Sequence, residues 1–270
     1  MHYGEMFASL APARRRLLLV LLAVAAVAAL TIGLVVATSG GGHARAIIDQ
    51  DRPGPVLLVP GYGGSESGLD VLASRLRAAG KTVDVVHLPD NAQGDLGAQA
   101  RALGTAARAA LPGASSVDVV GYSAGGVVAR LWVRDYGGAT LARRIVTLGS
   151  PQHGTQLAAL GALIPSVCPT ACRQLTPDSA LLAGLNAGNE TPAGPTFVSI
   201  WSTDDEVVLP PDSARLAGAL NITVQSVCAH AHVQHGDLPT NGIVESMVAL
   251  ELGAGPPVPL APADCRRLSS

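Results

Sequence analysis

The segment from residue 117 to 136 constrains the fold of this chain more than any other part of the sequence. It reads VDVVGYSAGGVVARLWVRDY. An apolar run, typical of a strand buried on both faces, passes through small residues directly into a run with helical spacing. We therefore expect a strand at 117–123 followed by a helix at 124–136, which is the start of a β–α unit.

The same alternation of strand and helix patterns continues on both sides of this unit. Further strands are expected at 55–61, 82–88, 144–150, 196–202 and 221–227, and further helices at 69–79, 95–111 and 242–252. Alternating elements of this kind favour an α/β fold with a mainly parallel central sheet and helices on both faces. After Leu252 the chain is rich in proline and is expected to form an extended tail.

The segment 154–194 interrupts the alternation. It contains two cysteines and several prolines and glycines, and it is long for a simple connection between elements. We interpret it as a cap or rim over a functional site.

The N-terminal region has the pattern of a membrane segment. Arg14, Arg15 and Arg16 precede an uncharged apolar run at 17–37, which is long enough to cross a bilayer as a helix. We expect residues 1–16 to be a cytoplasmic basic N-terminus, 17–37 a transmembrane signal anchor, 38–54 a linker and 55–270 the folded domain.

Two other interpretations of this apolar run stay open. A cleaved signal peptide has a shorter apolar core, but Ala44-Arg45-Ala46 could serve as its cleavage site. A buried core helix is disfavoured by the length of the run and by the basic cluster before it. With either an anchor or a signal peptide, the basic cluster stays in the cytoplasm and the domain lies outside.

Composition narrows the remaining possibilities. The formal net charge is -2 and aromatic residues make up 3% of the chain, so neither a basic surface nor a set of stacking platforms is available for nucleic acid.

The four cysteines, at 168, 172, 228 and 265, suit an oxidising compartment. We expect Cys168 to pair with Cys172 and Cys228 with Cys265, although four cysteines allow three pairings. A structural zinc site is disfavoured, because the paired CxxC units of such sites are missing.

Ser123 is the candidate nucleophile. It lies in GYSAG, which matches the GxSxG pattern between a strand and a helix, and the sharp turn of such a motif requires small flanking residues. A glycine- and serine-rich turn without chemistry is the alternative. A serine nucleophile also requires a base, which a carboxylate orients, and in this motif the two follow in the order acid, then histidine.

The candidates for these two roles occur in that order. Asp204 and Asp205 follow the strand expected at 196–202, and His230, His232 and His235 follow the last one. The spacing of the three histidines is also compatible with a metal cluster. Two backbone N–H groups are needed to stabilise an oxyanion. We assign these to Ala124, after the nucleophile, and to Tyr62, in the glycine-rich loop PGYGG.

Four motifs together resemble the small bacterial lipases of the α/β-hydrolase superfamily, such as the secreted lipases of bacilli and actinobacteria. They are LLVPGYGGS, VVGYSAGG, LGSPQHGT and SIWSTDDEVV, and HGDLP is similar to the loop that carries the histidine of that family. Pro60 stands where that family more often has a histidine. The resemblance covers about residues 55–252, and it implies an α/β-hydrolase fold with Asp205 as the acid and His235 as the base.

The resemblance implies serine-dependent hydrolysis of carboxylic esters through an acyl-enzyme, with an ester or lipid as substrate. We expect no cofactor, no metal and no nucleic acid, and a monomer held at the membrane by its N-terminal helix or secreted if the leader is cleaved. A cell-envelope acyltransferase with the same three residues and a non-catalytic hydrolase-like binding protein are the alternatives.

Overall fold

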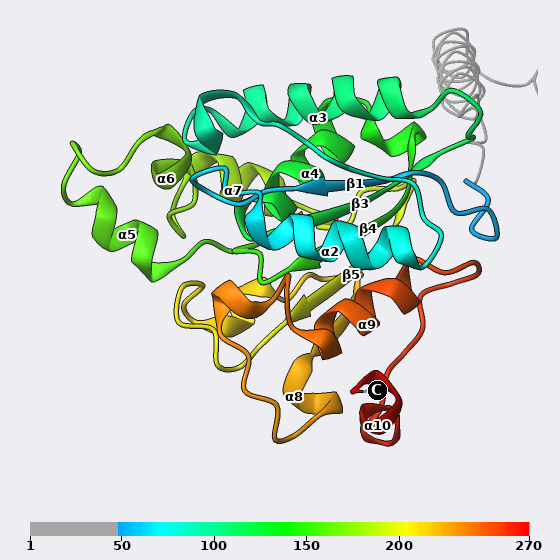
Figure 1. Cartoon of the computed structure of the whole chain (residues 1–270). Coiled ribbons are helices and arrows are strands. Elements are labelled where there is room, and N and C mark those ends of the chain that lie inside the picture. The colour runs from blue at the N-terminus through cyan, green and yellow to red at the C-terminus, as the bar shows by residue number, and fades with distance from the viewer. Residues whose placement is uncertain (1–47, 270) are drawn as a thin grey trace, which may run out of the picture. The chain divides into compact units, whose positions relative to one another are not determined.

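The computed structural model describes residues 48–269, and these form a six-stranded sheet in which every neighbouring pair of strands is parallel (Figure 1). The order across the sheet is β2-β1-β3-β4-β5-β6. The strands are β1 Val56–Val59, β2 Val83–Val85, β3 Val117–Tyr122, β4 Ala142–Leu148, β5 Thr196–Trp201 and β6 Leu220–Thr223. The predicted α/β architecture with a parallel central sheet is confirmed.

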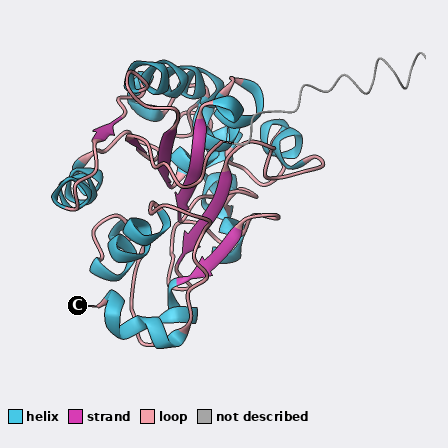
Figure 2. Ribbon diagram, turned by 90° about the vertical axis from the view of Figure 1, so that its right-hand side faces the viewer, coloured by secondary structure: helices cyan, strands magenta, loops and turns pink. Residues whose placement is uncertain are grey.

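Helices cover both faces of this sheet (Figures 1 and 2). On one face lie α3 (Leu96–Ala110) and α4 (Ala124–Asp135), and on the other lie α2 (Ser67–Ala78) and α9 (Gly242–Glu251). Strand side chains point alternately to the two faces, so Leu57 packs into the core with α3 and α4, while its neighbour Leu58 packs into the core with α2 and α9. All four of these helices were expected from the sequence.

Shorter elements connect the layers. They are η1 Pro89–Ala92, η2 Gly138–Thr140, α5 Gln156–Ala162, α6 Thr170–Gln174, α7 Ala180–Asn186, η3 Pro211–Ala214, α8 Val224–Val227, η4 His235–Asp237, η5 Pro262–Asp264 and α10 Cys265–Leu268. The segment 154–194 therefore folds into three short helices, α5 to α7, which Figure 1 shows grouped beyond one end of the sheet.

Three strands are shorter than expected by three or four residues, and the one expected at 55–61 is a strand only at Val56–Val59. The strand expected at 221–227 ends at Thr223, and a helical turn follows in which the Cys228 N–H donates to the Val224 carbonyl. This turn directs Val224 and Val227 into the core, so their apolar character reflects burial rather than a strand. The strand expected at 82–88 is a strand only at Val83–Val85.

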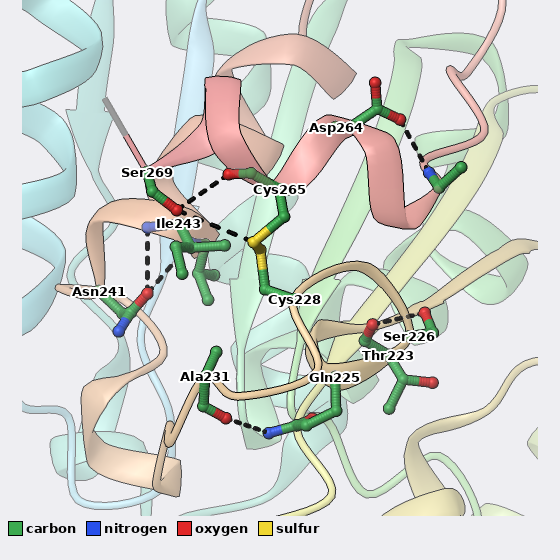
Figure 3. The surroundings of a disulfide bond; sticks show 12 residues. Thr223, Gln225, Ser226, Cys228, Ala231, Asn241, Ile243, Asp264, Cys265 and Ser269 are labelled. Carbon is green, nitrogen blue, oxygen red and sulfur yellow. Dashed lines mark hydrogen bonds between the residues drawn. A yellow bond between two sulfur atoms is a disulfide. The ribbon is translucent and has the colours of Figure 1, made fainter.

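The prediction of an extended C-terminal tail was wrong in part. Residues 265–268 form the helix α10, and the predicted Cys228–Cys265 disulfide joins it to the residue that follows α8. Figure 3 shows this bond, together with a hydrogen bond from the Ser269 hydroxyl to the Cys265 carbonyl. Leu268 is buried beside α9, so the tail closes one edge of the core.

The predicted membrane segment at 17–37 lies outside the described residues. Within residues 48–269, no helix has the length and apolar character needed to cross a bilayer. The end of the predicted linker packs against the domain, because the Gln50 carbonyl accepts hydrogen bonds from Gly255 N–H and from the Arg143 guanidinium.

Candidate active site

Ser123 occupies a strained turn at the carboxyl end of β3. Its φ is 54° and its ψ is -126°, a conformation that costs free energy for any residue with a side chain. The turn also brings backbones into close contact. A Cβ on Gly121 would lie 2.5 Å from the Gly126 Cα, and one on Gly125 would lie 2.3 Å from the Val59 carbonyl oxygen. The small residues of GYSAGG are therefore required by the geometry of the turn.

Three of the predicted site residues form one chain of hydrogen bonds. His235 Nε2 lies 3.0 Å from Ser123 Oγ, and His235 Nδ1 lies 2.7 Å from Asp205 Oδ2. Because the carboxylate can only accept, Nδ1 carries the proton and Nε2 is left to accept one from the serine hydroxyl. The side chains of His235 and Asp205 are 7% and 1% exposed, so water competes little for these bonds.

The structure also separates Asp205 from its neighbour Asp204. The second oxygen of Asp205 accepts from the Val207 and Val208 N–H groups at 2.9 and 2.7 Å, which fixes the carboxylate. Asp204 instead lies 3.1 Å from His232 Nδ1 in a pair at the surface.

The histidines do not gather around a common centre. His230 and His232 are exposed, whereas His235 is buried against Asp205. Within the described part of the chain, no group of three or more His, Cys, Asp or Glu side chains is placed to hold a metal ion.

Two residues that the sequence analysis did not single out hold His235 in place. Glu206 accepts a hydrogen bond from the His235 backbone N–H at 3.1 Å, and the Tyr122 hydroxyl donates to the His235 carbonyl at 3.2 Å. Burial and then the charge of Asp205 raise the pKa of Tyr122 to about 12, so the phenol remains a donor. Both contacts end on backbone atoms, for which the sequence carries no specific signal.

The two predicted oxyanion donors lie on segments adjacent to Ser123. A Cβ on Gly61 would lie 2.9 Å from the Ser123 Cβ, so the loop that contains Tyr62 runs directly against the serine. Ala124 begins α4, and the first N–H groups of a helix have no partner within it. Outside the helices and strands of residues 48–269, neither N–H group donates to a backbone carbonyl. Their role as oxyanion donors stays a prediction.

An apolar cavity opens beside the serine. Its volume is about 180 Å³. It is lined by Tyr62, Ser123, Pro151, Thr155, Leu157, Ala158, Val167, Cys172, Leu175, Val207 and Val208. With the exception of Ser123 and Thr155, these residues present apolar or aromatic groups, so the cavity favours an apolar ligand group.

A buried arginine of α4 holds the C-terminal end of the 154–194 segment by hydrogen bonds. Arg130 of α4 donates to Gln152 Oε1 at 3.0 Å, to Asn186 Oδ1 at 2.9 Å and to the Glu190 carbonyl. Burial lowers the pKa of Arg130 to about 10, so the side chain remains a cation. His153 pairs with Glu190 at 2.9 Å, and the end of the segment is thereby fixed.

Comparison with known proteins agrees with this arrangement. The model of a family described as Lipase (class 2) matches residues 98–236, which is more than half of the chain and includes Ser123, Asp205 and His235. A comparison with curated proteins gives no significant match.

Solved structures of similar fold include lipases from fungi and bacteria. Lipase B of Aspergillus fumigatus has a TM-score of 0.68 at 20% identity, over 84% of this chain and 59% of that protein. The mature lipase BlEst2 of Bacillus licheniformis has a TM-score of 0.54 at 20% identity, over 67% of this chain and 86% of that one. A structure reported for the metagenome-derived lipolytic enzymes LipS and LipT has a TM-score of 0.54 at 18% identity, over 73% of this chain and 94% of that one. This chain thus spans about three fifths of the Aspergillus lipase, and these likenesses establish the α/β-hydrolase fold.

Proposed function

Since this chain belongs to the class 2 lipase family, we propose that it hydrolyses carboxylic esters through an acyl-enzyme formed on Ser123. The observation that carries this proposal is the chain of hydrogen bonds from Asp205 through His235 to Ser123 Oγ. A buried base at 3.0 Å from a serine hydroxyl is what nucleophilic catalysis by serine requires.

The reaction would proceed in two halves. Ser123 Oγ attacks the ester carbonyl carbon while His235 Nε2 takes its proton, and the N–H groups of Tyr62 and Ala124 stabilise the oxyanion. His235 then gives that proton to the departing alcohol, which leaves the acyl group on Ser123. In the second half, a water molecule gives a proton to His235 and attacks the acyl carbon, and the proton returns to Ser123 as the acid is released. Asp205 holds the imidazole and stabilises its positive form throughout.

The surface around the cavity supports a lipid-like substrate. On α5 and the turn after it, five large apolar side chains are 50–77% exposed: Leu157, Leu160, Leu163, Ile164 and Val167. No charged residue occurs from 156 to 172. An exposed apolar patch of this kind, next to an apolar cavity, fits contact with lipid.

The two disulfides, Cys168–Cys172 and Cys228–Cys265, fit an oxidising compartment. We accordingly propose an extracellular domain at residues 55–270 with its cap segment at 154–194. It is either anchored by residues 17–37 or released by cleavage of the leader, and it acts as a monomer.

The test is hydrolysis of p-nitrophenyl esters, from acetate to palmitate, by the full chain with both disulfides intact. Ser123→Ala removes the nucleophile, and we expect the rate to fall by roughly 10⁴- to 10⁶-fold. A folded protein that hydrolyses none of these esters would overturn the proposal, as would an undiminished rate in Ser123→Ala. Transfer of the acyl group to an added alcohol, without hydrolysis, would instead identify an acyltransferase.

A further inference from the structure

The wall of the cavity beside Ser123 has two parts of different origin. Loops at the carboxyl ends of the strands supply Tyr62, Ser123, Pro151, Val207 and Val208. The cap segment supplies the rest: Thr155, Leu157, Ala158, Val167, Cys172 and Leu175. More than half of the lining residues therefore belong to the cap segment.

The helix α5 is too short to be stable without contacts to the rest of the domain. It has seven residues, of which Ala158 alone is buried, and an isolated helix of this length is unstable in water. Its N-terminal end is well fixed, because the Thr155 hydroxyl caps it and donates to the Val207 carbonyl, while the Gln156 N–H donates to the Leu209 carbonyl.

The C-terminal end of α5 rests on a disulfide. A Cβ on Gly161 would lie 3.4 Å from Cys172 Sγ and 3.9 Å from Cys168 Sγ, so the helix packs directly on the Cys168–Cys172 bond. The turn at 163–167 that follows is bonded mainly to itself and to α5: Leu163 N–H to the Leu160 carbonyl, Ile164 N–H to the Gly161 carbonyl, and Val167 N–H to the Ile164 carbonyl.

The other half of the disulfide belongs to a fixed element. The Ala171 N–H of α6 donates to the Gln93 carbonyl at 3.0 Å, and Gln174 Oε1 accepts from the Leu96 N–H at 2.8 Å. The disulfide and a hydrogen bond from Arg173 to the Cys168 carbonyl hold the turn and the C-terminal end of α5 against this anchored helix.

We propose that the Cys168–Cys172 disulfide is a selectivity element for the acyl group. The cavity of about 180 Å³ is smaller than the roughly 300–1,000 Å³ of most ligand pockets, so only part of a long acyl chain fits into it. The remainder of a longer chain lies on the exposed apolar side chains of α5 and the turn, whose positions the disulfide fixes. A preformed wall binds better than one that must be ordered by the substrate. Long acyl chains therefore depend on the disulfide, and short ones depend mainly on the loops of the sheet.

This inference rests on the proposed ester hydrolysis, and the experiment separates the two. The kcat/KM values of the full chain are measured on p-nitrophenyl acetate and p-nitrophenyl decanoate for the native protein, for Cys168→Ser/Cys172→Ser, and for Cys228→Ser/Cys265→Ser. We expect the decanoate-to-acetate ratio to fall at least fivefold in the first variant and to stay within twofold in the second, which loses a disulfide far from the cavity.

Each result has a distinct meaning. If the native protein hydrolyses neither ester, the proposed function fails. If it hydrolyses both and the ratio is unchanged in Cys168→Ser/Cys172→Ser, the selectivity role is overturned. A rise in the ratio also overturns it, because the disulfide would then restrict the wall instead of building it.

A second pair of variants tests the wall without removing a disulfide. Val167 lies on the turn and lines the cavity, whereas Val71 lies on α2, and their exposures are 62% and 48%. Val167→Ser makes the wall polar at an exposed position where folding tolerates the change, so the ratio should fall two- to threefold. Val71→Ser should leave it unchanged. Equal ratios in the two variants would count against the proposal.

Discussion

The two ends of the central sheet both bury charged side chains, but they use them differently. At the carboxyl end, Asp205 and His235 form a chain of hydrogen bonds that stops at Ser123 Oγ beside a cavity. At the amino end, Arg143 donates to both oxygens of Asp118 at 2.8 and 2.7 Å, with both side chains fully buried.

The amino end has a structural role. Arg143 also donates to the Gln50 and Gly253 carbonyls, and Arg144 donates to the Glu251 carbonyl. These bonds join the segment before β1 and the loop after α9 to the sheet. A buried charge is therefore not by itself a sign of a catalytic role. At the carboxyl end, by contrast, the chain of hydrogen bonds ends at the Ser123 hydroxyl, which borders a cavity.

The largest effect is expected from a change of the carboxylate at the carboxyl end. In Asp205→Asn, the amide can still accept from Val207 and Val208 N–H but can present its NH₂ group to His235, which favours the wrong tautomer. We expect kcat on a short ester to fall about 10⁴-fold with little change in stability. Asp204→Asn is the matched control, and its kcat should change less than threefold because Asp204 pairs with an exposed histidine. Equal losses in both variants would contradict the assignment of the acid.

The matching change at the amino end should affect stability and not turnover. Asp118→Ala leaves the Arg143 guanidinium buried without its carboxylate, which should lower the free energy of unfolding by about 3–5 kcal/mol. Urea denaturation measures this loss, with Asp84→Ala, at an exposed position on β2, as the control. The folded fraction of Asp118→Ala should keep its kcat/KM within twofold. A large loss of activity in that folded fraction would mean that the two ends are coupled.

A smaller effect is expected at Glu251, which is also buried at the amino end. Burial raises its pKa from 4.5 to about 7. Below pH 4.5 the carboxyl is protonated in the folded and the unfolded protein, so it has no effect on stability. Between pH 4.5 and 7 it ionises only in the unfolded protein, and stability falls. Above pH 7 the cost levels off at about 3 kcal/mol.

Replacing this carboxyl removes its ionisation. The free energy of unfolding of the native protein should therefore fall between pH 4 and pH 8 by up to about 3 kcal/mol more than that of Glu251→Gln. Urea denaturation at a series of pH values measures it. A difference that does not vary with pH would show that Glu251 is ionised in the folded protein.

The sequence predicted those parts of the site that depend on local geometry. The strand, the GYSAG turn and the helix α4 are adjacent in the chain, and the steric demands of that turn leave a visible pattern of small residues. The order of serine, acid and histidine followed from the motif, the choice of Asp205 and His235 followed from the resemblance to lipases, and the structure brings these side chains together.

The parts that the sequence could not predict depend on distant contacts. Nothing in the residues near Val224 indicates that the chain turns into a helix there, because the same apolar side chains suit a strand or a buried turn. Glu206 and Tyr122 contact the backbone of His235, and any residue could provide that backbone. The packing of α5 on a disulfide could not be predicted from the sequence either, because a single glycine such as Gly161 does not indicate which side chain lies against it.

We propose that the hydrogen-bonded chain at the carboxyl end makes Ser123 nucleophilic. The most direct test of this proposal is reaction of the full chain with a fluorophosphonate probe, followed by mass analysis of the peptides. We predict a single adduct on Ser123, formed far more slowly in His235→Gln. A folded protein that is not labelled, or that is labelled on another serine, would contradict the account.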